Sequence, residues 1–498
     1  MTDERFLKLK PLVARNWLPA EAVLSDPETL RSLYDDLDAR ASASVSDFET
    51  WVLDRSELAA GIGQAGSILY IEMTCDTADA VRAKAYQDFV ETIEPLAKER
   101  EHRLDEKFFA LSERFQLDPL RYGVYVREAE ADVKIFRTEN IPVQTKISLL
   151  SQEYQAVTGA MTVHFDGKER TLPEMSRFLL ETDRPLRERA WRAVAERRRR
   201  DENRIERIFD DMRGLREQVA RNAGFKNFRD YQFAAYHRFD YTPDDCKTYH
   251  RSVRDIIVPI RHEIDRRRRQ CLGVESLRPW DTAVDVLSRP ALRPFSEVSR
   301  LEEGVGRIVR GIDQDLAELY EDMRSHGLLD LASRKGKAPG GYQNTLDEVR
   351  KPFIFMNAVG VDDDVRTLLH ESGHAFHAYL CASDPLVGYR HAPMEFSEVA
   401  SMSMEMMAND GLGEFYGPQD ARRSVLEHLE GVVSILAWVA TIDAFQHWIY
   451  ENPGHTSAER VSRWIALHEE YGGGEVDWSG LEPERAGLWH RQLHIFEV

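Results

Sequence analysis

The sequence predicts a mostly α-helical protein with little β-structure. Most of its 498 residues lie in stretches rich in helix-forming side chains, with apolar residues at the helical period of 3.6. Only a few short runs have the composition of strands. Hydrophobic residues make up 42% and charged residues 31% of the chain, which is typical of a folded globular protein and not of a disordered or fibrous one. The length corresponds to about three domains' worth of chain.

The charge and the cysteines exclude several classes of partner and location. The formal net charge is −20, so we expect no nucleic-acid partner and no attraction to anionic lipid. We interpret the basic runs at 197–200 and 266–269 as solvated helix faces, because acidic residues flank them. The four cysteines form no CxxC pair, and the first residues contain no apolar signal sequence. We therefore expect reduced thiols and a cytoplasmic location.

Four long helical segments are expected along the chain. Residues 77–115 are predicted to form long amphipathic helices. Residues 185–214 are predicted to form the next helix, with Asp183 as its N-cap. Further helices are predicted over 243–270 and 301–324.

The most apolar segment, Gly431–Ile449, is also predicted to be helical. It contains Asp443, Gln446 and His447, which would be costly to place in lipid. We therefore expect a buried core helix, not a membrane span.

Strands are predicted at two places. Residues 161–165 and 168–172 flank Asp166-Gly167, a pair that suits the two-residue type I′ turn of a hairpin. The short apolar run 352–356 is the second candidate, and the glycine-rich segment 333–342 before it is predicted to be a loop. The hairpin and the polar turn after it suggest an N-terminal helical lobe over 1–185 and a second lobe over 186–498.

The segment His370-Glu371-Ser-Gly-His374 carries the clearest chemistry in the sequence. On a helix, positions i and i+4 lie on one face, so His370 and His374 can both present a ring nitrogen to one Zn²⁺ ion. Glu371 then projects beside the metal, where it can take a proton from the attacking water and pass it to the leaving amine. Three acids at 362–364 suit the start of such a helix. Gly373 lowers helix stability by about 1 kcal/mol, which is tolerable where another segment packs closely.

A catalytic zinc site needs a third protein ligand. His377 lies two turns from His370 and is interpreted as a core or supporting residue. Glu398 is the preferred ligand, because it heads a stripe of small and apolar residues on the next predicted helix, where a carboxylate needs a charge or a metal beside it. Glu395 is its competitor. Ser401 and Glu405 share the stripe and are either groups that orient the ligands or ordinary polar residues.

These motifs resemble the M3 family of zinc peptidases, the thimet oligopeptidase and oligoendopeptidase F group. The likeness rests on HESGHAFH at 370–377 with Glu398-Val-Ala-Ser401, on GKAPGGY at 336–342 and on PFIFMN at 352–357, and it covers about residues 150–498. It implies a mostly α, two-lobed metallopeptidase with a deep channel that admits oligopeptides and a small sheet beside the cleft.

The resemblance also implies the roles of single residues. One zinc ion per chain would be held by His370, His374 and Glu398, with Glu371 as the catalytic glutamate. Gly340, Gly341 and Tyr342 would lie along the cleft, where an extended peptide can add as a strand. In members of this family, the chain usually continues beyond the position that matches Val498. That continuation carries tyrosines that stabilise the oxyanion. We expect His494 to contact the carbonyl oxygen, and the substitutes for those tyrosines to be Tyr342, Tyr389 or His391, at some loss of rate.

Two other functions stay open from the sequence. A metallocarboxypeptidase would need a cation for the substrate's terminal carboxylate, for which Arg390 or Arg366 is available. A catalytically impaired, metal-containing peptide-binding protein is the other. A di-iron bundle is disfavoured, because a second Glu-x-x-His to partner Glu371–His374 is not found.

Overall fold

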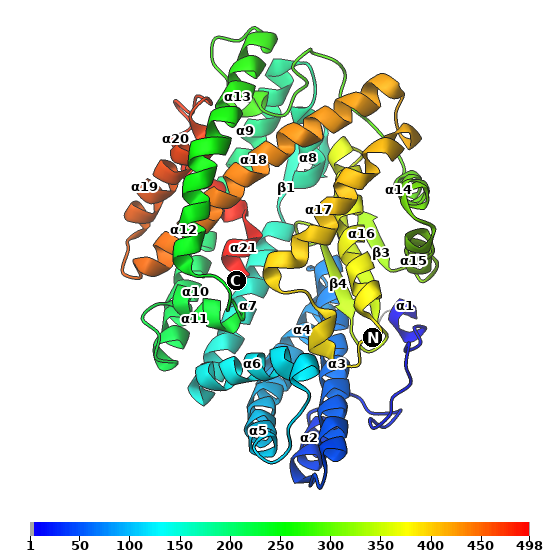
Figure 1. The fold of residues 1–498 in the computed structure, drawn as a ribbon. Coiled ribbons are helices and arrows are strands. Elements are labelled where there is room, and N and C mark those ends of the chain that lie inside the picture. Colours follow the sequence, from blue (N-terminus) through cyan, green and yellow to red (C-terminus); the bar gives the residue numbers. More distant parts are fainter. Residues whose placement is uncertain (1–3, 498) are drawn as a thin grey trace.

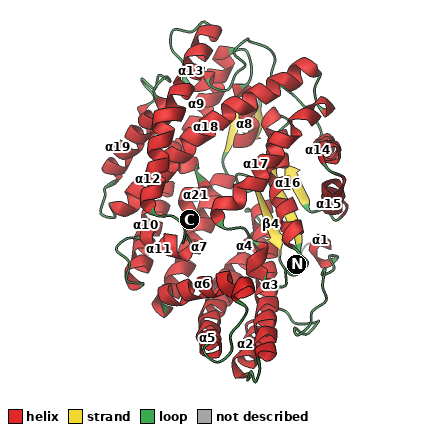
Figure 2. Cartoon of the chain, viewed as in Figure 1, coloured by secondary structure: helices red, strands yellow, loops and turns green. Residues whose placement is uncertain are grey.

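Helices form most of this computed structural model, which describes residues 4–497 (Figure 2). The N-terminal helices are α1 (Glu4–Leu7), α2 (Pro27–Ala39), α3 (Val45–Cys75), α4 (Ala80–Asp88), α5 (Glu94–Ser112), α6 (Pro119–Ile135) and α7 (Ile141–Gly159). The middle helices are α8 (Leu172–Leu179), α9 (Arg184–Arg200), α10 (Glu202–Asn222), α11 (Phe228–Ala235), α12 (Pro243–Ser252), α13 (Val258–Leu272), α14 (Val298–Ile312) and α15 (Gln314–Ser325). The last are α16 (Asp362–Cys381), α17 (Ser397–Met407), α18 (Pro418–Glu451), α19 (Ser457–His468), α20 (Glu482–Ala486) and α21 (Leu493–Phe496). The prediction of a mostly α fold is confirmed.

Two of the predicted helices are interrupted by aspartates. The predictions of single helices over 185–214 and 301–324 are wrong, because α9 ends before Asp201 and α14 ends before Asp313. Asp313 has an extended backbone, and its side chain accepts a hydrogen bond from the N–H of Leu316, which starts α15 as an N-cap. Asp183 caps α9 as predicted.

Two further helical segments contain a π-helical turn ahead of a proline. The segments are η1 (Phe89–Ile93) and η3 (Val253–Ile257), which join α4 to α5 and α12 to α13. Pro95 and Pro259 follow within the first two residues of α5 and α13. A proline has no N–H for the regular bond to residue i−4, and the widened turn ahead of it accommodates this gap.

The predicted hairpin is present as β1 (Thr162–Phe165) and β2 (Lys168–Thr171). Asp166 and Gly167 have φ values of 54° and 75°, which is the left-handed pair that a type I′ turn requires. The strands pair with Phe165 opposite Lys168.

A second sheet has the strand order β3-β5-β4. It consists of β3 (Leu329–Ala332), β4 (Tyr342–Leu346) and β5 (Lys351–Ala358). The predicted strand 352–356 is its central strand, and residues 353–356 are fully buried. Strand β5 runs parallel to β3 and antiparallel to β4, so β4 is an edge strand among the described residues.

The apolar side chains form three main cores. The first lies between the β3-β5-β4 sheet and α3, α14, α15 and α16. The second joins α7, α10 and α11 to α18, α19 and α21. The third is built mainly from α2, α3, α5 and α6. The boundary between residues 1–185 and 186–498 stays a prediction; the second core takes helices from both sides of it.

Helix α18 connects the parts of the molecule. In Figure 1 it crosses the fold diagonally, from the side of α14 and α17 to the side of α12 and α19. By length and composition alone it is long and apolar enough to span a membrane. Its Ala440, Phe445 and Ile449 are buried in the second core, as predicted, whereas Ile435 and Val439 are exposed. The helix is therefore a core helix on one side only.

Candidate metal centre

Helix α16 carries the HExxH segment directly behind the sheet. Strand β5 leads into it through a short turn, and the Asp364 carboxylate accepts hydrogen bonds from the N–H groups of Val359, Gly360 and Val361 at 2.7–2.9 Å. This carboxylate fixes the start of the helix. Leu368 and Leu369 are completely buried in the sheet core, so the opposite face of α16 presents the histidines.

His370, His374 and Glu398 meet at one point. The Nε2 atoms of the two histidines are 3.3 Å apart. Glu398 Oε2, from the first turn of α17, lies 3.1 Å from His370 Nε2 and 3.5 Å from His374 Nε2. The structure thus brings Glu398, and not its competitor Glu395, to the two histidines. Glu395 lies 3.9 Å from Arg238.

These three atoms fit one tetrahedral metal ion. A zinc ion about 2.0–2.1 Å from each ligand places the ligand atoms about 3.3–3.4 Å apart, which agrees with the observed triangle. Two nitrogens and a carboxylate oxygen are also a donor set that Zn²⁺ prefers. The Glu398 side chain is 58% exposed, so solvent reaches the triangle. A catalytic zinc site would need such access, because it keeps one position for water or substrate.

The charges around the histidines also suit a cation. Against the effect of burial, hydrogen bonds to Glu398 and Glu405 raise the pKa of the His370 ring to about 10. Hydrogen bonds from His370 and His374 hold the pKa of Glu398 well below its usual range. The site therefore has an excess of negative charge that a divalent cation would neutralise.

Glu371 lies beside this triangle and is buried. Its Oε2 atom has no hydrogen-bond partner in the described part of the chain. Burial raises the pKa of Glu371 to about 7, although His370 and His374 oppose the shift. A carboxyl group with a pKa near neutrality can both accept and return a proton. The backbone of Gln343, on β4, opposes this rise in the pKa, and a Cβ atom at Gly341 would lie 3.4 Å from Glu371 Oε1, so the start of the edge strand lies next to Glu371.

Three further residues orient the candidate ligands. Glu405 Oε1 is 2.7 Å from His370 Nδ1, and its other oxygen is 2.7 Å from His428 Nε2. Ser401 Oγ donates to Glu398 Oε2 at 2.8 Å. Ser401 and Glu405 therefore occupy the orienting positions that the sequence left open. His428 has no signal in the sequence, because it comes from α18, outside both motif helices.

Gly373 brings α16 and α17 together. A Cβ atom at this position would lie 2.5 Å from the carbonyl oxygen of Ala400 and 2.5 Å from Cα of Ser401. Only a glycine permits this approach without a shift of the backbone, which is the close packing that the sequence suggested.

Gly340, Gly341 and Tyr342 lie where the loop 333–341 enters β4. Gly341 is exposed, and a Cβ atom there would lie 3.4 Å from Glu371 Oε1. The Tyr342 hydroxyl is 2.6 Å from Thr74 Oγ1, and its ring stacks on Phe355 at 4.6 Å. The side chain of Tyr342 thus ties β4 to α3 and β5.

The remaining predicted residues have partners outside the triangle or do not belong to it. His391 Nε2 is 3.2 Å from Asp347 Oδ1, just past the other end of β4. His494 is exposed on α21, where Nε2 of Gln492 is 2.7 Å from its Nδ1. The Tyr389 hydroxyl donates to the carbonyl of Arg121, so it is not free to donate to a substrate in this structure. His377 does not belong to the group of candidate ligand atoms found in the described residues.

The two arginines considered for a carboxypeptidase have other partners. Arg366 donates to the carbonyl of Glu405 and to Asn409 and Ser424. Arg390 donates to the carbonyls of Asp384, Pro385 and Asp347. Both are about 5% exposed, so neither is placed to bind a substrate carboxylate.

Two models of known protein families match this sequence. The model for Peptidase family M3 matches residues 178–496, and the model for the Peptidase M3 N-terminal domain matches residues 24–136. The sequence is 24% identical over 248 residues to oligopeptidase PepF of Bacillus subtilis (strain 168), which is 48% of this chain and 36% of that protein. It is 22% identical over 225 residues to group B oligopeptidase PepB of Streptococcus agalactiae serotype III (strain NEM316), 43% of this chain and 36% of that protein.

A solved structure of PZ peptidase A with an inhibitor has the same fold. The TM-score is 0.89 at 27% identity, over 96% of this chain and 85% of the other. The sequence matches, in contrast, span only about a third of the length of the two curated relatives.

Proposed function

The chain belongs to peptidase family M3, and we propose that it is a zinc-dependent endopeptidase that hydrolyses internal bonds of short, unfolded oligopeptides. The observation that carries this proposal is the triangle of His370, His374 and Glu398, with the buried Glu371 carboxyl beside it. In the proposed site the triangle holds one zinc ion.

The chain's own residues supply positioning and proton transfer. A bound zinc ion supplies a Lewis acid that polarises the scissile carbonyl and makes water a better nucleophile at neutral pH. Glu371 takes the proton of the attacking water and returns it to the leaving amine. Glu405 and Ser401 hold the candidate ligands in orientation through the hydrogen bonds described above. His494 is proposed to contact the carbonyl oxygen.

The edge strand β4 is proposed to align the substrate. Its free side faces Glu371, and its backbone N–H and C=O groups can pair with an extended peptide. Gly340 and Gly341 leave room for the peptide backbone at one end of β4, and His391 stands at the other. A peptide that adds as a strand is bound through its backbone groups and not through particular side chains. This favours a broad set of unfolded oligopeptides as substrates.

The test is to compare wild-type protein with the Glu371→Gln variant on a mixture of peptides of about 5 to 20 residues. Mass spectrometry identifies the cut positions, and metal analysis measures zinc per chain. We expect internal cuts that a chelator abolishes and Zn²⁺ restores, and a variant that keeps zinc but loses turnover. A variant with full activity would refute the role of Glu371.

The same experiment separates the two other functions. Removal of residues only from the C-terminal end would indicate a carboxypeptidase. Zinc retention and peptide binding without any cleavage would indicate a peptide-binding protein. A cytoplasmic location is part of the proposal; it is supported by the four cysteines, all in the described part of the chain and all free thiols.

A further inference from the structure

A pocket adjoins the entrance of β4 and is not used by the chemistry above. Its volume is about 520 Å³, and its walls come from segments far apart in the sequence: α7, α8, α9, the loop before β4 and the segment 483–492. Apolar side chains such as Leu172, Met175, Trp191 and Leu488 form much of the lining. Gly340 lines the pocket, and the next residue, Gly341, borders Glu371. The pocket therefore lies beside the metal centre.

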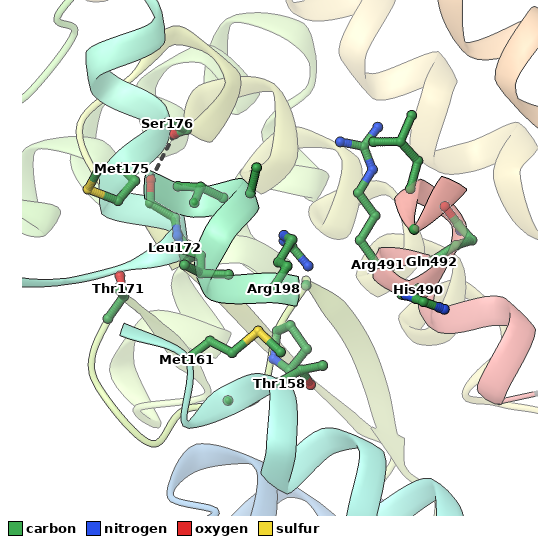
Figure 3. A pocket seen from close by; sticks show the side chains of 18 of the residues that line it. Thr158, Met161, Thr171, Leu172, Met175, Ser176, Arg198, His490, Arg491 and Gln492 are labelled. Atoms are coloured by element: carbon green, nitrogen blue, oxygen red, sulfur yellow. Dashed lines mark hydrogen bonds between the residues drawn. The ribbon is translucent and has the colours of Figure 1, made fainter. Parts of the chain in front are cut away.

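Two arginines line this pocket. Arg198 enters from α9 and Arg491 from the segment before α21, and Figure 3 shows both side chains directed into the open space. Neither guanidinium group forms a hydrogen bond or an ion pair with any residue that the structure describes. Arg491 instead lies over the Trp438 ring, at 5.1 Å from its centroid. Two like charges thus lie near each other with no counter-ion among residues 4–497.

The other charged groups around the pocket are paired. Arg199 lies 3.4 Å from Glu484, Lys337 lies 2.9 Å from Asp330, and His490 lies 2.9 Å from Glu206. The positive charge left over is therefore localised on Arg198 and Arg491. Desolvation, together with the charge of Arg198, lowers the pKa of Arg491 to about 10. A guanidinium group stays protonated in proteins, so both side chains are cations at neutral pH.

The direction of strand pairing connects the pocket to the substrate. Antiparallel pairing is the commoner and slightly more stable arrangement, and β4 already pairs antiparallel with β5. A peptide that adds antiparallel to the free side of β4 runs from the His391 end toward Gly340. Its C-terminal part then leaves β4 at the pocket, and its N-terminal part lies near Asp347 and His391.

We propose that Arg198 and Arg491 bind the C-terminal carboxylate of the oligopeptide substrate. This inference rests on the proposed function and deepens it: the substrates are short peptides with a free C-terminus, and the pocket fixes how far from that end the cut is made. Guanidinium groups suit this task because each can donate two parallel hydrogen bonds to a carboxylate.

The test uses pairs of internally quenched peptides that differ only in a free C-terminal carboxylate or a C-terminal amide. We expect wild-type protein to favour the acid by about 10- to 100-fold in kcat/KM, the range of a charge-assisted interaction. In the Arg198→Gln/Arg491→Gln variant, the ratio should fall to about 1 while kcat/KM for the amide stays unchanged. A purely structural role would lower both substrates together, and that result would overturn the proposal.

Arg197→Gln is the matched control. It removes the same charge from the same helix, but Arg197 pairs with Asp201 and does not line the pocket. Its acid-to-amide ratio should equal that of the wild type. Amidated peptides ending in Glu or Gln form a further arm: if Glu restores the advantage of the free acid, the pocket binds any carboxylate and the C-terminal assignment is wrong.

Binding measurements keep this inference separate from the proposed function. Fluorescence anisotropy of labelled acid and amide peptides with the Glu371→Gln variant requires no turnover. Tighter binding of the acid, lost when Arg198 and Arg491 are also replaced, supports the carboxylate site even if the protein cleaves nothing. Equal affinity for acid and amide overturns it even if the protein is an active peptidase.

Discussion

Replacing Gly373 by alanine tests the link between helix packing and the metal centre. The added Cβ would lie 2.5 Å from the backbone of Ala400 and Ser401, whereas ordinary contacts begin at 3.4 Å. Both clashing groups are backbone, so no side chain can rotate away. Helix α17 must therefore move outward by about 1 Å, and Glu398 lies on this helix, within one turn of the contact.

The shift of α17 should lower the stability of the fold only slightly but should weaken zinc binding and activity strongly. Overpacking destabilises a fold by about 1–3 kcal/mol, and replacing a helical glycine by alanine returns about 1 kcal/mol, so the net loss of stability is about 0–2 kcal/mol. Metal–ligand distances tolerate only about 0.2 Å. A displacement of 1 Å between Glu398 and the histidines should therefore lower zinc affinity and peptidase activity by about 100-fold or more.

Zinc titration against a chelating competitor, peptide cleavage and thermal unfolding measure these quantities on the same samples. Gly431→Ala is the control, because Gly431 also lies in a helix but has nothing within 4 Å of an added Cβ. It should raise stability by up to about 1 kcal/mol and leave zinc binding unchanged. A Gly373→Ala variant with wild-type zinc affinity and activity would refute the reasoning.

Two further predictions concern the groups around the metal. Glu405→Ala should lower zinc affinity by about 10- to 100-fold because His370 loses the hydrogen bond that orients its ring, and competitive metal titration showing no change would contradict the role of Glu405. Removing the metal with a chelator should lower the thermal midpoint, since a ligand at 1,000 times its Kd stabilises the folded state by about 4 kcal/mol. Calorimetry measures the midpoint before and after Zn²⁺ is restored, and an unchanged midpoint would mean that the fold gains nothing from the metal.

Local rules predicted most of the fold. The helical period predicted the helices, and the Asp166-Gly167 pair predicted the hairpin turn, because both depend on neighbours in sequence. The breaks at Asp201 and Asp313 were missed because apolar periodicity continues on both sides of a single aspartate; of the two, only Asp313 caps the next helix with its side chain. An aspartate in a helix-forming stretch is compatible with a solvated helix position and with an N-cap, and only the tertiary path of the chain decides between them.

Some residues of the metal centre could likewise be predicted from the sequence, and others could not. His370 and His374 follow from the i, i+4 geometry of one helix, and the apolar stripe on α17 favoured Glu398 over Glu395. His428 could not be inferred, since no spacing rule connects α18 to the motif. The Arg198–Arg491 pair was missed for the same reason: one was interpreted as part of a solvated basic run, and the structure turns it toward the pocket.

An edge strand that can align a peptide, as proposed for β4, is also a surface on which a strand of any other protein molecule can pair, and such pairing is a usual route to aggregation. This molecule limits the hazard in two ways. Strand β4 has only five residues, so it offers few backbone groups to a flat partner strand. The net charge of −20 makes copies of the chain repel one another. A flexible peptide can still pair with so short a strand, so the proposed alignment of substrates does not require a long edge that promotes aggregation.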